Sequence, residues 1–173
     1  MVIVCGKEIL FRKLGSDDAP EYSRLRTEAI TGPDKRNYYI DPSEELSRTE
    51  DDWRKVCTET CERAIFGAFD KEELVGAMSV SIWDGDHDGK TSYFRAAYIK
   101  KELRHSPVAK CLLNMMYDWS KEHGCQDAIY AIRDDLIEWK NNQIKNGAVE
   151  DHREPLRYDG QYANAVWYRR ALG

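Results

Sequence analysis

A short basic loop between a predicted strand and a strongly amphipathic helix carries the residue types best suited to bind an anion. The strand ends near residue 99, the loop contains Arg104 and His105, and the helix contributes Lys110 in its first turn. Backbone N–H groups of such a loop, together with the positive end of the helix dipole, favour phosphate or pyrophosphate. An ordinary connection with a solvated basic edge explains the same residues equally well, so both interpretations stay open at this point.

An acidic, glycine-containing turn at residues 84–89 is the second candidate. It matches the first half of an EF-hand loop, in which alternating carboxylates surround Ca²⁺. The twelfth position of that loop requires a bidentate acid, and here it is Arg95, a cation that repels the ion. We therefore interpret the segment as a turn between two strands, whose carboxylates could still attract a cationic substrate.

Histidine and cysteine chemistry has little support in the sequence. The four histidines are isolated from one another, and no signature of a serine hydrolase, a zinc protease or a P-loop is present. Cys57 and Cys61 are one helical turn apart, but no second ligand pair follows at zinc-finger spacing. We predict no metal site, and we expect the cysteines to be small buried hydrophobic residues in a reducing, cytoplasmic compartment.

The composition limits the kinds of partner. The chain has 173 residues, 42% of them hydrophobic, and a formal net charge of -5 at pH 7. That length predicts one domain over residues 1–173, with enough apolar material for a core. The mild acidity argues against nucleic acid and against an anionic membrane as the main partner. No apolar run is long enough to span a membrane, and the first residues lack the pattern of a signal peptide.

The hydrophobic pattern predicts an α+β (mixed α/β) protein with the element order ββααβββαβαββ. The helix between Val108 and Gly124 has the clearest pattern, because its apolar residues recur at i, i+3, i+4, i+7, i+8 and i+11. The other predicted helices cover residues 19–30, 42–63 and 136–146. The predicted strands cover residues 2–5, 9–14, 64–69, 74–83, 91–99, 127–132, 148–157 and 163–170.

Several segments resemble motifs of the GCN5-related N-acetyltransferase (GNAT) family, and the likeness covers nearly the whole chain. Residues 25–29 (LRTEA) are similar to the end of the family's first helix, and IFGAF and LVG within residues 65–76 are similar to its hairpin. Residues 98–104 (YIKKELR) stand where the family writes vyVhPeyR. Residues 104–109 (RHSPVA) align with its pyrophosphate loop, [QR]xxGx[GA], and residues 136–148 align with its closing motif, NxxAxxxYxxxGF.

The resemblance implies a single central mixed sheet of about six to seven strands flanked by about four helices. It also implies direct transfer of an acetyl group from acetyl-CoA to a primary amine of a small molecule or peptide. The pantetheine of the donor would lie between the splayed strands at residues 91–99 and 127–132, and the loop amides would hold its pyrophosphate. The donor-binding residues expected on this basis are Ala97, Tyr98, Ile99, Arg104, His105, Ser106, Val108, Ala109 and Lys110.

The chain departs from the family pattern on the donor side. Pro107 replaces the loop glycine, which removes one N–H donor and holds φ at about -65°. Leu136 and Trp139 replace an Asn and a small Ala, and Gln143 replaces a tyrosine that often protonates the thiolate. Trp139 could either pack in the core or block the pantetheine groove. The departures keep a second function open, namely a GNAT-fold binding or regulatory protein that does not use acetyl-CoA.

The catalytic and acceptor-binding residues are less clearly marked. The position of a glutamate base in some members falls on Tyr93, whose unperturbed pKa of about 10 makes it a poor base at neutral pH. We predict Tyr93 and Tyr130 as the catalytic residues, with water relaying the proton of the acceptor's ammonium group. The acceptor is expected between the loop at residues 32–42 and the last two strands, and a homodimer stays open. The residues expected around the acceptor are Asn37, Tyr38, Tyr39, Tyr158 and Tyr162.

Overall fold

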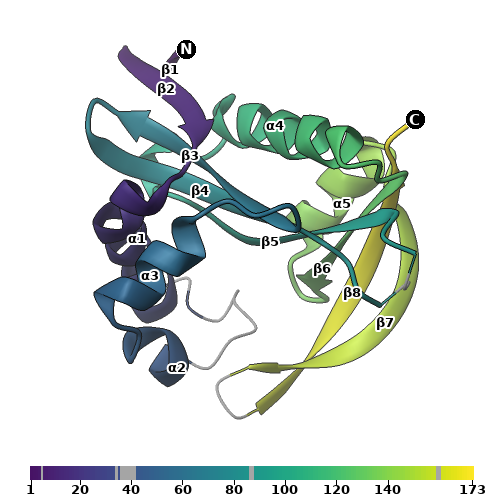
Figure 1. Cartoon of the computed structure of the whole chain (residues 1–173). Helices are drawn as coiled ribbons and strands as arrows, with labels where there is room; N and C mark the ends of the chain where they lie inside the picture. The colour runs from purple at the N-terminus through teal and green to yellow at the C-terminus, as the bar shows by residue number, and fades with distance from the viewer. Residues whose placement is uncertain (5, 34, 36–41, 86–87, 159–160) are drawn as a thin grey trace.

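One eight-stranded sheet forms the centre of the computed structural model, which describes all residues except 5, 34, 36–41, 86–87 and 159–160. The strands follow the spatial order β1-β2-β3-β4-β5-β6-β8-β7 (Figure 1). Neighbouring strands are antiparallel except β5 and β6, which run parallel. The strands are β1 (Val2–Val4), β2 (Lys7–Lys13), β3 (Arg63–Asp70), β4 (Glu73–Ile82), β5 (Thr91–Ile99), β6 (Asp127–Arg133), β7 (Val149–Tyr158) and β8 (Gln161–Ala171).

The single mixed sheet confirms the predicted fold class. Eight strands agree with the element order and exceed the six to seven that the resemblance implies. The short first strand β1 is part of this excess: it is three residues long and pairs with β2 next to Gly6, whose φ of 76° suits glycine. β5 begins and ends at the predicted residues, because its aromatic and β-favouring residues stop where a run of charged residues begins at Lys100.

Five α-helices among the described residues cover the two faces of the sheet. α1 (Ala19–Thr31), α2 (Pro42–Leu46) and α3 (Glu50–Cys57) lie on one face, whereas α4 (Val108–Glu122) and α5 (Ile137–Lys145) lie on the other (Figure 1).

The single helix predicted at residues 42–63 is wrong, because the segment forms two short helices. Thr49 starts the second one: its hydroxyl accepts a hydrogen bond from the Asp52 N–H at 3.3 Å, and the Asp52 carboxylate accepts one from the Thr49 N–H at 2.9 Å. Such a reciprocal cap begins a new helix rather than continuing an old one.

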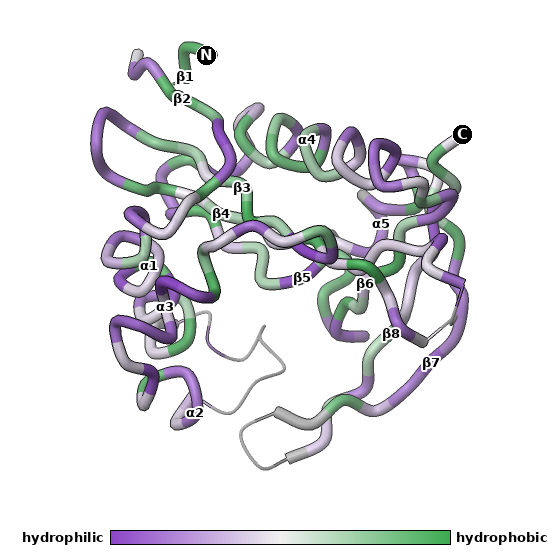
Figure 2. Tube along the Cα trace, in the orientation of Figure 1, coloured by the Kyte–Doolittle hydropathy of each residue, from purple (hydrophilic) through white to green (hydrophobic). Residues whose placement is uncertain are grey.

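Apolar side chains pack on both faces of the sheet. On the α4 face the predicted periodicity is confirmed by Val108, Leu112 and Met116, which are at most 1% exposed, whereas Cys111 and Met115 are half-buried at its margin. A second cluster lies against α1 and α3. Figure 2 shows the hydrophobic stretches along β3 and β4 and the contrasting hydrophilic character of β7.

A β-bulge in β5 shapes the centre of the sheet. Ala77 of β4 pairs with Tyr98, but Ser79 pairs with Arg95, so β5 carries one extra residue between the two pairs. Ala96 in this bulge has a left-handed φ of 54°. On its other edge β5 pairs with β6 over its first three residues only. Beyond them the two parallel strands diverge, and the facing edges have no strand partner among the described residues.

Candidate functional site

The divergence of β5 and β6 leaves the end of β5 without a neighbouring strand on its β6 side among the described residues. The Lys100 N–H donates to the Val75 carbonyl oxygen on β4 at 3.0 Å. Because backbone groups alternate along a strand, those of Ala97 and Ile99 are directed to the opposite edge. There the Ile99 carbonyl oxygen accepts a hydrogen bond from Arg104 Nε at 2.9 Å. This edge of β5 is where the resemblance to the GNAT family implies that the pantetheine binds.

The side chains of the three β5 residues predicted to bind the donor divide between the two faces. Ala97 and Ile99 are half-buried against the core on the α4 face. Tyr98 lies in the other core, and its Oη donates to Glu28 Oε1 on α1 at 2.7 Å. The backbone of Tyr98 pairs with β4 and its side chain bonds α1, so this residue connects β5 to both elements.

The loop after β5 presents a set of backbone donors. A 3₁₀ turn at Lys101–Leu103 precedes it, and His105 takes a left-handed φ of 59°. Ser106 Oγ donates to the Leu103 carbonyl oxygen at 2.5 Å and accepts from the Val108 N–H at 3.3 Å. Four further N–H groups donate to no described residue, and they are those of His105, Ser106, Ala109 and Lys110. Unpartnered N–H groups at the start of a helix form a site for an anion.

Pro107 fits this loop without strain. Its φ of -62° and ψ of -11° are values that proline adopts readily, and its carbonyl oxygen accepts from the Cys111 N–H at 2.9 Å. The left-handed position of the loop falls on His105 instead. The replacement of the family glycine therefore costs the loop one N–H donor and leaves its backbone path intact.

Tyr130 of β6 and Gln143 of α5 form a direct contact that the sequence analysis did not anticipate. Tyr130 Oη donates to Gln143 Oε1 at 2.8 Å. The Tyr130 ring is 8% exposed and lies between Phe94 and Tyr168, at centroid distances of 6.4 and 6.2 Å. Burial raises the pKa of the Tyr130 phenol, so it is protonated at neutral pH. Gln143, the residue at the family's tyrosine position, thus accepts a hydrogen bond from a phenol that β6 supplies.

The two other departures from the family's closing motif, Leu136 and Trp139, have different surroundings. Leu136, just before the helix, is half-buried and packs against the core of the α4 face. Trp139 is 52% exposed, so the alternative that it packs in the core is wrong.

Tyr93 lies on the other face of the sheet. The preceding residue, Ser92, bonds Ser120 of α4 at 2.8 Å, so alternation directs Tyr93 away from α4. Its ring centroid is 5.0 Å from that of Trp83 and 5.6 Å from that of Trp167. Burial raises the pKa of the Tyr93 phenol, which can therefore donate a hydrogen bond but remains protonated at neutral pH.

The sequence analysis missed both tryptophans of this cluster. Alternation along β8 indicates which residues share a face with Trp167, but β8 inserts between β6 and β7 in the sheet. Nothing local to the sequence reveals that Trp167 neighbours Tyr93 on a strand 74 positions earlier.

Most of the predicted acceptor residues cannot be assigned contacts. Asn37, Tyr38 and Tyr39 lie outside the described residues. Tyr158 is described only through its backbone, as the last residue of β7. Tyr162, near the start of β8, is 75% exposed.

The acidic turn has the features of a connection between strands in the part that is described. Asp88 Oδ1 accepts from the Lys90 N–H at 2.9 Å, a common turn interaction. Among the described residues, no group of three or more His, Cys, Asp or Glu side chains is arranged to hold a metal ion. No helix in the described part of the chain is long and apolar enough to cross a membrane.

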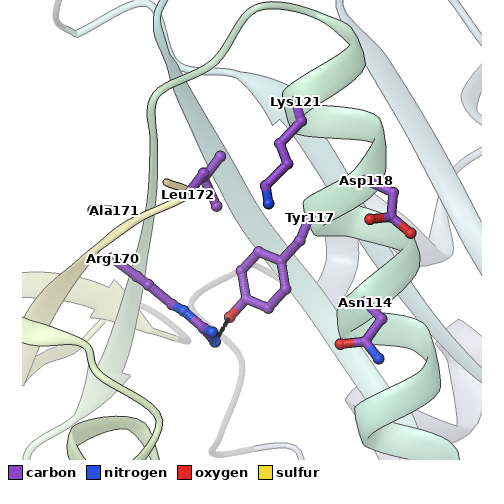
Figure 3. Close-up of a pocket in the computed structure, with 7 residues that line it drawn as sticks. All are labelled: Asn114, Tyr117, Asp118, Lys121, Arg170, Ala171 and Leu172. Atoms are coloured by element: carbon purple, nitrogen blue, oxygen red, sulfur yellow. Dashed lines mark hydrogen bonds between the residues drawn. The ribbon is translucent and has the colours of Figure 1, made fainter.

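A pocket of about 290 Å³ lies between the C-terminal half of α4 and the end of β8 (Figure 3). Within it Arg170 Nη1 donates to Tyr117 Oη at 2.8 Å. The Tyr117 ring also contacts Phe94, at a centroid distance of 5.2 Å. The pocket therefore borders the aromatic rings around Tyr130, but its lining does not include Tyr130 itself.

Comparison with solved structures gives the fold. An acetyltransferase of the GNAT family from Streptococcus pneumoniae superposes with a TM-score of 0.79 at 13% identity, covering 96% of this chain and 100% of that one. The yncA protein of Salmonella typhimurium, solved with its cofactor acetyl-CoA, gives 0.73 at 12% identity, covering 96% and 95%. The PaiA N-acetyltransferase of Thermoplasma acidophilum, in complex with coenzyme A, gives 0.69 at 14% identity, covering 95% and 99%.

The sequence comparison is more specific than the fold. No curated protein matches the chain as a relative. The model of the acetyltransferase (GNAT) family, however, matches residues 26–139, which is more than half of the chain. This match includes the bulged strand, the amide-rich loop and the first residues of α5. The chain therefore belongs to the GNAT acetyltransferase family.

Proposed function

We propose that the chain is an N-acetyltransferase that moves the acetyl group of acetyl-CoA directly to a primary amine. The observation that carries the proposal is the amide-rich loop between β5 and α4. Its four N–H groups without a described partner lie at the end of the strand that diverges from β6. A pyrophosphate needs such a donor set, and pantetheine needs an adjacent strand edge that no other strand occupies.

The charges around the loop also suit acetyl-CoA. Lys101, His105 and Lys110 are exposed on or beside the loop and can approach phosphate oxygens. Arg104 bonds the Ile99 carbonyl oxygen at the end of the preceding strand β5, so we assign it to ordering the loop. Val108 contributes its backbone only, because its side chain is fully buried in the core.

We assign the proton transfers to residues on opposite faces of the sheet, near the point where β5 and β6 diverge. The neutral amine attacks the thioester carbon and a C–N bond forms. The C–S bond then breaks, the departing thiolate takes a proton from the proton donor, and the proton that the nitrogen loses after the attack restores that donor. Tyr130 Oη is the proton donor in this proposal, because it is protonated and held by Gln143 on the donor face. Water removes the proton of the acceptor's ammonium group near Tyr93 on the opposite face. The acceptor is a small-molecule or peptide amine, and the compartment is the cytoplasm, as the sequence predicts.

Thermal unfolding with acetyl-CoA and with free CoA tests the proposal. A ligand at about 100 times its Kd stabilises by about 2.7 kcal/mol. For a chain of this size that corresponds to a rise in Tm of about 5–11 °C. We expect such a rise with both ligands, followed by consumption of acetyl-CoA when a suitable amine is added. No rise at millimolar ligand would instead favour the binding or regulatory protein that does not use acetyl-CoA.

A further inference from the structure

Arg95 lies at the point where β5 leaves β6, and it has no counter-ion among the described residues. It directly precedes the bulge residue Ala96 and shares the face of Tyr93, opposite the amide-rich loop. Its side chain is exposed, and its guanidinium carbon lies 5.8 Å from the centroid of the Tyr93 ring. No described residue forms an ion pair or hydrogen bond with it.

Two arginines of β6 and β8 on this side of the sheet are neutralised by carboxylates. Arg169 Nε bonds Asp151 at 2.9 Å, and Arg133 Nη2 bonds Asp135 at 2.8 Å. Arg95 thus differs from these two arginines, because no described carboxylate neutralises its positive charge. An exposed guanidinium on a ring face presents a planar set of donors that matches a carboxylate.

The surface beside Arg95 is apolar and aromatic. The rings of Trp83, Tyr93 and Trp167 contact one another at centroid distances of 5.0–5.6 Å. Trp167 is 4% exposed, and its indole N–H has no hydrogen-bond partner among the described residues. Trp167 therefore lies in the interior of this cluster, and the half-buried rings of Trp83 and Tyr93 form its accessible part.

These features favour one class of acetyl acceptor. A plain alkylammonium ion would approach Arg95 as a like charge, whereas an amine that also carries a carboxylate would pair with it. We propose that the acceptor is a free amino acid with an apolar or aromatic side chain. Arg95 binds its carboxylate, and the half-buried rings of Trp83 and Tyr93 contact its side chain. This inference rests on the proposed acetyltransferase function and adds the substrate class to it.

The test compares amino acids with their decarboxylated counterparts, which share the amine and the side chain but lack the carboxylate. One pool contains phenylalanine, tyrosine, tryptophan and leucine, and the other contains phenethylamine, tyramine, tryptamine and isopentylamine. Acetylated products are identified by mass spectrometry. We expect at least about a 10-fold higher kcat/KM for a member of the first pool than for its counterpart, as for loss of a charge-assisted hydrogen bond.

Variants identify the residue responsible. Arg95→Gln should raise KM for the amino acid about 10-fold or more, whereas kcat/KM for the plain amine should not fall and should rise if anything, because the variant removes a like charge. Arg95→Lys should recover part of the loss, because it restores the charge without the planar donors. Arg54→Gln makes the same change of charge at an exposed position of α3 and should leave both substrates unaffected.

The outcomes separate this inference from the proposed function. Equal or better acetylation of the plain amines, or no acetylation of either pool by a protein that acetyl-CoA stabilises, overturns the amino-acid acceptor while leaving donor binding intact. An unchanged KM in Arg95→Gln overturns the role of Arg95. Absence of any stabilisation by acetyl-CoA or CoA overturns the proposed function itself.

Discussion

Replacing Tyr130 by Phe removes the proposed proton donor and little else. The ring is buried between Phe94 and Tyr168, and a phenylalanine ring fills the same space. The interaction lost is the 2.8 Å hydrogen bond to Gln143, which is itself half-buried. Such a bond contributes about 0.5–1.5 kcal/mol net. The expected fall in Tm is therefore only about 1–6 °C.

The effect of Tyr130→Phe on catalysis should be much larger than its effect on stability. A general acid contributes about 10²–10⁴-fold to the rate, so kcat should fall by that factor while KM for acetyl-CoA stays unchanged. Loss of the thioester absorbance at saturating acceptor measures kcat. Tyr168→Phe is the matched control, because it removes a hydroxyl from the adjacent ring of the same stack. A full kcat in Tyr130→Phe, or an equal loss in Tyr168→Phe, would refute the assignment.

The pH dependence of stability provides a second readout for the same variant. Burial raises the pKa of Tyr130 in the folded state above its unfolded value of about 10. The stabilisation from keeping the phenol neutral is therefore complete below about pH 10 and is lost as the pH rises towards the folded-state pKa. Tyr130→Phe should lose stability less steeply than the wild type in alkaline denaturation experiments. Identical alkaline slopes would contradict this expectation.

Three further predictions concern other parts of the fold. Glu45→Ala leaves the charge of Arg26 buried, with a cost of about 3–5 kcal/mol in chemical denaturation, and Arg26→Met with Glu45→Leu should recover most of it. An unchanged stability of Glu45→Ala would show that the pair is not buried as described. Burial raises the pKa of the Cys57 thiol to about 12, so its contribution to stability is present below the unfolded value of about 8.5 and is lost as the pH rises above it. A thiol reagent near neutral pH should modify exposed Cys61 first and Cys57 only on unfolding, and equal rates would speak against this burial. Pro107→Gly restores one loop N–H, so calorimetric titration should give up to about 10-fold tighter acetyl-CoA binding, at a cost of about 0.4–1 kcal/mol in stability. Weaker binding by this variant would count against the loop as the pyrophosphate site.

Local patterns predicted the types of nearly all elements. The spacing of Val108, Leu112 and Met116 identified α4 because burial on one helix face leaves a direct periodic trace in the sequence. The helix expected at residues 42–63 was wrong because Thr49 and Asp52 form a cap inside it, and hydrophobic spacing alone does not reveal a cap.

The site was harder to predict than the fold because its residues meet through non-local pairings. The loss of the family tyrosine at Gln143 suggested a missing acid, and only the approach of α5 to β6 reveals that Tyr130 lies beside it. Likewise, Arg95 entered the sequence analysis only as an obstacle to calcium binding. Its position beside Tyr93 and Trp167 depends on the bulge in β5 and on the insertion of β8 between β6 and β7.

The most direct test of donor binding is a titration of the ¹⁵N-labelled protein with acetyl-CoA, followed by the chemical shifts of its backbone amides. The account predicts the largest changes in chemical shift at His105, Ser106, Ala109 and Lys110. Further changes are expected at Ala97 and Ile99, on the edge of β5 that faces β6. Changes confined to other segments, or none at millimolar acetyl-CoA, would contradict the assignment of this loop and strand edge to the acetyl donor.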